Sequence, residues 1–166
     1  MNILFLCTHN ACRSILAEAI FRAEAIKAGV NIRVQSAGST PRGTIHPLTL
    51  QYLKHWQIDT AGLTSKSWDE MADFAPDLVI TVCDQAAGES CPVWFGKAVK
   101  AHWSLPDPSR YGLSPDVQKQ EFSALYLALQ QRAKALFQAT TKPDSTLLSV
   151  IATRFPLQLT GFEPSN

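Results

Sequence analysis

Residues 7–14, with the sequence CTHNACRS, hold two of the four cysteines of the chain, followed by an arginine and a serine. Five residues separate Cys7 from Arg13, directly after the apolar run 3–6. A short loop between a strand and a helix turns backbone N–H groups inward, and the helix start adds partial positive charge. Arg13 can contact two oxygens of one anion. The predicted site for a tetrahedral oxyanion comprises Thr8, His9, Asn10, Ala11, Cys12, Arg13 and Ser14.

Cys7 lies at the start of this loop, where the same groups surround its sulfur. Groups that attract an anion also lower the pKa of a thiol, from about 8.5 to about 4–7. Cys7 is therefore predicted to be a thiolate nucleophile at neutral pH. We expect Ser14 to hydrogen-bond the Cys7 sulfur and to cap the helix that follows.

Other interpretations of the two cysteines are weaker. The loop has no glycine and no Gly-Lys pair, so it is not a Walker A nucleotide site. The four cysteines are spaced C-x4-C and C-x7-C, whereas zinc sites usually use C-x2-C. A structural interpretation stays open, in which Cys7 is a buried strand-end residue and Arg13 lies on a helix surface.

Strands and helices alternate along the chain. A continuous apolar run predicts a strand at 2–6, and the segment DLVITV predicts one at 77–82. Two further strands are predicted at 31–38, which ends in small residues, and at 98–103. Apolar residues at helical spacing predict helices at 15–28, around Leu50, Leu53 and Trp56, and at 115–138. This alternation predicts an α/β fold of three layers, α/β/α, with a central four-stranded parallel sheet.

Candidate catalytic residues follow several of the predicted strands. Cys7 follows the first strand, residues 36–38 the second, and Cys83 the third, while Asp107 comes a few residues after the fourth. The functional crevice of a parallel sheet lies beyond the carboxyl ends of its strands. Distant cysteines and one acid are therefore expected at one edge.

Composition indicates one soluble domain. The chain has 166 residues, 46% of them hydrophobic and 17% charged, with a net charge of +1. A net charge this small does not attract nucleic acid or an anionic membrane. Neither a signal peptide nor an apolar run of about 18 residues is found, so we expect a cytoplasmic protein whose cysteines form no permanent disulfide framework. We place the domain at residues 1–139, followed by a C-terminal extension, 140–166, to which no role is assigned.

The C-x5-R-S loop after an N-terminal strand resembles the low-molecular-weight protein tyrosine phosphatase superfamily. Across roughly residues 2–138, five segments are similar to the arsenate reductases built on that Rossmann-like fold: FLCTHNACRSILAEA, SAGSTPRGTIHP, TSKSW, TVCDQAAGESCPVW and AHWSLPDP. The loop alone points only to the superfamily. The cysteine-bearing segment after the third strand, together with HW and DP, points to arsenate.

This resemblance implies a role for each candidate residue. Cys7 would attack arsenate, which Arg13 and the loop bind, and Asp107 would protonate the departing oxygen. Cys83 would then attack Cys7, and Cys91 would resolve the resulting disulfide. No bound cofactor is implied, only an external thiol reductant.

The reductant is left open by the spacing of the last two cysteines. Seven residues separate Cys83 from Cys91, where the thioredoxin-linked pattern has six. The loop also resembles the branch that uses glutathione and glutaredoxin. Either donor is therefore a possible partner, and Cys12, often present in thioredoxin-using relatives, adds to the mixed signature.

Several residues have competing interpretations. Cys12 is either a packing residue or a back-up thiol for Cys7. Asp107 could be a structural acid or a cap, and Cys83 and Cys91 could be core or surface thiols without exchange. Some relatives hold potassium with an acid at the position of Lys66, so we expect no potassium here and no other metal.

Two further functions compete with arsenate reduction. A tyrosine or small-molecule phosphatase would need Cys7, Arg13 and Asp107 but would gain nothing from Cys83 and Cys91, and some residual phosphatase activity is compatible with the reductase. An anion-binding or thiol-sensing module without turnover would not need Asp107.

Overall fold

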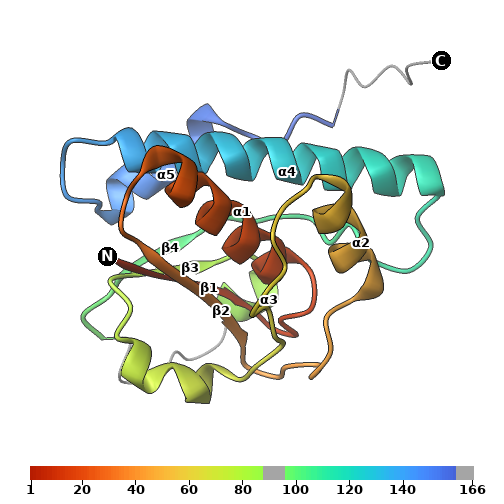
Figure 1. Cartoon of the computed structure of the whole chain (residues 1–166), viewed down its shortest axis with the longest axis horizontal. Coiled ribbons are helices and arrows are strands. Elements are labelled where there is room, and N and C mark those ends of the chain that lie inside the picture. Colours follow the sequence, from red (N-terminus) through yellow and green to blue (C-terminus); the bar gives the residue numbers. More distant parts are fainter. Residues whose placement is uncertain (88–95, 160–166) are drawn as a thin grey trace.

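Four parallel strands form the centre of the computed structural model, which describes residues 1–87 and 96–159 (Figure 1). They are β1 (Asn2–Cys7), β2 (Arg33–Gly38), β3 (Leu78–Thr81) and β4 (Val99–His102), and their order in the sheet is β2-β1-β3-β4. All four lie within one or two residues of the predicted ranges. Because every pair is parallel, the carboxyl ends of the strands lie at one edge of the sheet.

Helices cover the two faces of the sheet unequally. The helices on one side are α1 (Arg13–Ala28), α2 (Pro47–His55), α4 (Pro115–Gln138) and α5 (Ser145–Arg154) (Figure 1). On the other side, the 3-10 helix η1 (Trp68–Phe74) packs against the smaller apolar cluster. The one-turn helix α3 (Asp84–Ala87) follows β3, and its Ala86 is buried in the main cluster. The predicted three-layer α/β/α fold with a central parallel sheet is confirmed.

The helix boundaries differ from the predictions only at their ends. The helix expected from Ile15 begins at Arg13, and the one expected to include Trp56 ends at His55. The last long helix has the predicted range. Helix η1 was not predicted, although Ser67 and Glu70 form a capping box at its start, a signal that the sequence carries.

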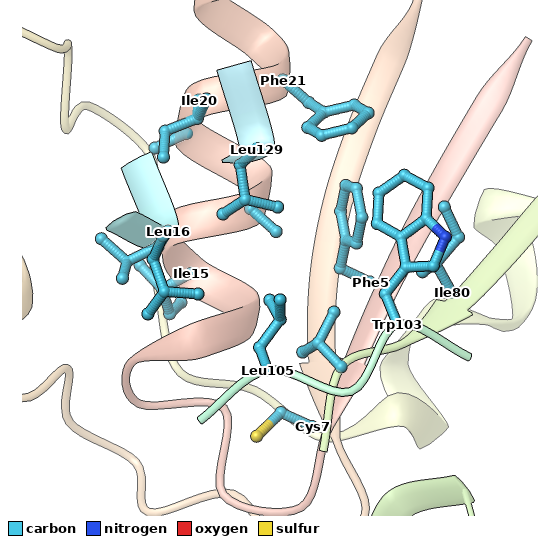
Figure 2. Packing of buried hydrophobic residues seen from close by; sticks show 14 of the residues in the cluster. Phe5, Cys7, Ile15, Leu16, Ile20, Phe21, Ile80, Trp103, Leu105 and Leu129 are labelled. Atoms are coloured by element: carbon cyan, nitrogen blue, oxygen red, sulfur yellow. The ribbon is translucent and has the colours of Figure 1, made fainter. Parts of the chain in front are cut away.

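Aromatic side chains fill the main core between the sheet and α1 (Figure 2). The rings of Phe5 and Phe21 meet edge to face with centroids 4.8 Å apart, and Trp103 lies 5.9 Å from Phe21. Burying such a side chain contributes about 1.5–3 kcal/mol. Cys7 lies at the loop end of this cluster, so the reactive region begins where the rigid core ends.

Helix α5 packs against β4 and α4. Leu148 and Ile151 are buried in the main cluster, and the Trp103 indole N–H donates to the carbonyl of Leu148 at 3.0 Å. The division at residue 139 stays a prediction, but α5 shares the core of the preceding residues. Within the described ranges, none of the helices combines the length and the apolar character that crossing a membrane requires.

Truncation of Leu148 measures how strongly α5 supports the fold. Leu148→Ala is expected to lower the free energy of unfolding by about 2–5 kcal/mol, because it leaves a cavity in the main core. Val150→Ala, on the same helix at a side chain that is 55% exposed, should change it by less than about 0.5 kcal/mol. Chemical denaturation would measure both, and equal stabilities for the two variants would contradict this packing role.

Candidate active site

Three segments meet at the carboxyl edge of the sheet: the loop after β1, the turn after β3 and the segment after β4. The backbone N–H of Thr8 donates to the sulfur of Cys83 at 3.3 Å, and the Arg13 guanidinium donates to the carbonyl of Leu105 at 3.1 Å. The structure thus brings Cys83 and the segment leading to Asp107 against the Cys7 loop. A separate open cleft of about 810 Å³, beside Asp77 and Lys142 at the opposite edge, contains none of the predicted site residues.

The carbonyls of the loop are turned away from the site. Three of them accept hydrogen bonds from backbone N–H groups after β2: Thr8 from Thr40 (2.9 Å), His9 from Arg42 (3.0 Å) and Ala11 from His46 (3.0 Å). The carbonyl and the N–H of a trans peptide point in opposite directions. The N–H groups of His9, Asn10 and Cys12 are therefore directed toward the inside of the loop, as an oxyanion site requires.

Asn10 holds the loop in its unusual shape. Its φ is +45°, a left-handed conformation that asparagine tolerates better than most residues. The side-chain amide donates to the hydroxyls of Ser14 (2.8 Å) and Ser36 (3.0 Å), and its oxygen accepts from the backbone N–H of Lys66 (2.9 Å). One buried amide therefore connects the loop with α1, β2 and the segment before η1.

A fully buried carboxylate supports this network. Glu18 accepts from the Ser36 hydroxyl at 2.6 Å and pairs with Arg22, while the Lys66 ammonium lies 3.8 Å away. Burial lowers the pKa of Lys66, and Glu18 opposes that shift. A buried charge needs such partners. A side-chain cation thus already lies beside Glu18, and the absence of a metal ion stays a prediction.

Gly38 lets the loop pack against β2. It pairs with Cys7 in the parallel register, and a Cβ at this position would lie 2.5 Å from the carbonyl oxygen of Thr8 and 2.9 Å from that of Cys7. Both contacts are with backbone atoms, which cannot move aside without deforming the loop. Only glycine fits here.

Cys7 and Cys83 hydrogen-bond each other, and each shifts the pKa of the other. The pKa of Cys83 is lowered to about 5 by the hydrogen bond from Cys7 and by donors from Thr8 and Ala86, against the opposing effect of burial. The pKa of Cys7 is raised by Cys83 and by burial, although Arg13 and the His9 N–H oppose this. Within the pair, these surroundings favour a thiolate on Cys83 over one on Cys7. The role of Cys7 as the attacking thiolate stays a prediction.

Cys12 is buried at the end of the loop, with 5% of its surface exposed. Burial raises its pKa to about 12, although hydrogen bonds with Thr49 and Ser109 oppose the shift. A neutral, enclosed thiol is a poor nucleophile. These surroundings favour the packing role of Cys12 over the back-up role.

Ser14 is not the helix cap that the sequence predicted, while its hydrogen bond to the Cys7 sulfur stays a prediction. It is the second residue of α1, and its hydroxyl accepts from Asn10. The N-cap position belongs to Cys12, which makes no side-chain cap hydrogen bond. Ser14 therefore supports the shape of the loop rather than the end of the helix.

Asp107 lies in the segment after β4, close enough to influence the charge of Cys12. One carboxylate oxygen accepts from the backbone N–H of Ser109 (2.9 Å) and from its hydroxyl (2.6 Å). The guanidinium of Arg110 donates to the carbonyl of Asp107 at 2.9 Å and also pairs with both carboxylate oxygens of Glu121 on α4. This clamp holds the acid-bearing segment in place.

Sequence reasoning missed the clamp and the support from Thr49. Arg110 and Glu121 lie far enough apart that no spacing rule connects them, and the buried Thr49, whose hydroxyl donates to the carbonyl of Ala11 at 3.0 Å, looks like a surface residue in sequence. The remaining predicted residue, Cys91, lies outside the described residues.

Comparison with known proteins identifies the relatives of this site. The model of the family "Low molecular weight phosphotyrosine protein phosphatase" matches residues 2–146. The chain belongs to this family. An arsenate reductase of Staphylococcus xylosus is 36% identical to the chain over 108 residues, which are 65% of this chain and 79% of that protein. A protein-arginine-phosphatase of Bacillus subtilis is 32% identical over 149 residues, 82% of this chain and 97% of the relative.

Solved structures of the family share this arrangement of strands and helices. One is an arsenate reductase in the phosphate-binding state, with a TM-score of 0.64 and 26% identity over 82% of this chain and 95% of that one. Another is a thioredoxin-dependent arsenate reductase of Corynebacterium glutamicum, with a TM-score of 0.59 and 29% identity over 82% of this chain and 60% of that one. The family thus contains both reductases and phosphatases.

The charge on the cysteine pair can be titrated. The ultraviolet absorbance of thiolate should rise as the pH increases through about 5, because Cys83 loses its proton there, well below the ordinary value of about 8.5. Cys12→Ser is the control and should leave this step unchanged, since the pKa of Cys12 is raised to about 12. A wild-type protein whose thiolate absorbance rises only above about pH 8 would contradict the lowered pKa of Cys83.

Proposed function

We propose that the protein is an arsenate reductase, which converts arsenate to arsenite and serves in arsenic detoxification. The observation that carries this proposal is the second thiol: the Cys83 sulfur accepts from the loop N–H of Thr8 and hydrogen-bonds Cys7. Phosphorus chemistry gains nothing from a thiol in this position, whereas reduction of arsenic(V) needs two electrons from a pair of thiols.

The first step is addition to arsenic. Arsenate binds to the inward N–H groups and to Arg13, and a basic arsenate oxygen takes the proton of Cys7. The Cys7 sulfur forms a bond to arsenic, and one arsenic–oxygen bond breaks. Asp107 gives a proton to that oxygen, which leaves as water.

The second step is reduction. The Cys83 thiolate attacks the sulfur of Cys7, the disulfide forms, and the electron pair of the sulfur–arsenic bond passes to arsenic. Arsenic falls from the +5 to the +3 state and departs as arsenite. Cys91 then attacks Cys83, releasing Cys7, and an external reductant returns the second disulfide to thiols.

The reductant is an external dithiol or thiol system, thioredoxin or glutathione with glutaredoxin. The C. glutamicum relative described as thioredoxin-dependent supports the first choice. Both systems operate in the cytoplasm, where a cycle that ends in free thiols can be sustained. No resident cofactor takes part in the scheme.

Phosphatase activity is the second candidate function, favoured by the protein-arginine-phosphatase that matches the chain over 97% of its own length. Cys7 as phosphoryl acceptor, Arg13 and Asp107 are sufficient for it. Ser109 and Arg110 follow the acid, and neither provides the aromatic wall that a phosphotyrosine ring would contact. We therefore assign to this chemistry only a residual activity.

Arsenate-dependent consumption of NADPH tests the proposal directly. With thioredoxin and its reductase, or with glutathione, glutaredoxin and glutathione reductase, the wild type should turn over. Cys7→Ser, Cys83→Ser and Cys91→Ser should each lose at least about a hundredfold in rate, because each breaks the relay. Cys12→Ser is the matched control and should keep most of the activity.

The same variants test the phosphatase alternative through their hydrolysis of p-nitrophenyl phosphate. Hydrolysis of p-nitrophenyl phosphate should be slow in the wild type and should survive Cys83→Ser. Brisk hydrolysis without arsenate turnover under either reductant would favour the phosphatase, and arsenate turnover by Cys83→Ser at the wild-type rate would exclude the relay.

A further inference from the structure

A histidine at the end of β4 contacts the chain on both sides of Cys83. The Nε2 atom of His102 lies 2.9 Å from a carboxylate oxygen of Asp84, the residue after Cys83. The Nδ1 atom lies 2.8 Å from the hydroxyl and 3.1 Å from the carbonyl oxygen of Thr81, two residues before Cys83. Ser104 adds a hydrogen bond from its hydroxyl to the same Asp84 oxygen at 2.8 Å.

The chemistry of these groups fixes the direction of the bonds. A carboxylate only accepts, so Nε2 carries a proton and donates to Asp84. The imidazole ring is rigid, and its two nitrogens therefore hold Thr81 and Asp84 at a set separation. Cys83 lies within the bracketed segment.

The position of the Cys83 sulfur depends on this segment. The sulfur accepts from the N–H of Thr8 at 3.3 Å and from that of Ala86 at 3.4 Å, so it is held between the oxyanion loop and the start of α3. A rotation of the turn at Asp84 would move Ala86 and the sulfur together. Backbone hydrogen bonds with Leu6 and Leu105 fix Val82, the residue before Cys83. After Cys83, the side chain of Asp84 is held by His102 and Ser104.

We propose that His102, Asp84 and Ser104 form a staple across Cys83, positioning its sulfur in line with Cys7 for the step that forms the first disulfide. The three are positioning residues, since none of them touches the reacting atoms, and the proposal rests on the arsenate reductase function. Attack on a sulfur requires the incoming sulfur in line with the bond that breaks, and small displacements are costly.

A purely stabilising role fits the contacts less well. The side chain of Asp84 is 83% exposed and that of His102 is 35% exposed. Exposed ion pairs add little to stability. We therefore assign to the bonds of Asp84 a positioning role: they hold the turn that carries the Cys83 thiol.

Single turnover in a Cys91→Ser parent isolates the step in question, because the reaction stops at the Cys7–Cys83 disulfide. Arsenite release after mixing with arsenate should be about tenfold to a hundredfold slower in His102→Ala and in Asp84→Ala. His102→Gln, which can still donate to Asp84 and accept from Thr81, and Asp84→Asn, which can still accept, should recover part of the rate. Asp73→Ala, at an exposed acid of η1, is the matched control and should equal the parent.

Hydrolysis of p-nitrophenyl phosphate by the same variants separates positioning from damage to the fold. It requires Cys7, Arg13 and Asp107 but no attack by Cys83, so it should fall much less than arsenite release in His102→Ala and Asp84→Ala. Equal arsenite rates for His102→Ala and its parent, or an equal fall in both activities, would overturn the staple while leaving the proposed function intact. Arsenite release at the parental rate after Cys83→Ser would instead overturn the proposed function.

Discussion

The binding site depends on backbone N–H groups of the loop after β1, which converge on one small volume. The loop after β1 turns its carbonyls outward, where the segment after β2 binds them, and leaves its N–H groups and Arg13 facing a small volume. Such a volume stabilises one negative charge and resists a second. The N–H of Thr8 donates to the Cys83 sulfur and helps to lower the pKa of that thiol. An arriving oxyanion competes for the same groups, so binding of the substrate and activation of the thiols are linked.

The rest of the fold keeps this volume in shape. Asn10 accepts a left-handed conformation and distributes its hydrogen bonds over three segments, and the buried Glu18 is retained because Arg22 and Lys66 compensate its charge. Gly38 allows β2 to approach within the space that a methyl group would occupy. The apolar core beneath supplies rigidity, so the loop lies at the end of a fixed strand.

Much of this could be read from the sequence, for identifiable reasons. Strands β1 and β3 are buried almost throughout and appear as continuous apolar runs, and the long helix 115–138 has a clear period, so these elements were predicted well. The placement of Cys83 near Cys7 followed from topology, since residues after parallel strands share an edge. Helix η1 was missed because its seven residues hold too few apolar positions to show a period, although its capping box was readable.

The contacts within the site could not be predicted in the same way. The Arg110–Glu121 clamp and the staple at His102 join residues whose separations follow no local rule. The spacing C-x5-R-S predicted a lowered pKa for Cys7 but could not show which donors surround Cys83. The N–H groups of Thr8 and Ala86, which lower the pKa of Cys83, reach its sulfur only in the folded chain.

The central claim is that Cys7, at the end of β1, and Cys83, which follows β3, together reduce one arsenate. The most direct measurement is peptide mapping by mass spectrometry of Cys91→Ser protein after one equivalent of arsenate, with no external reductant. A peptide pair joined through Cys7 and Cys83, formed in proportion to the arsenite released, is the expected result. Arsenite released without that disulfide, or a disulfide of Cys7 with Cys12 in its place, would contradict the account.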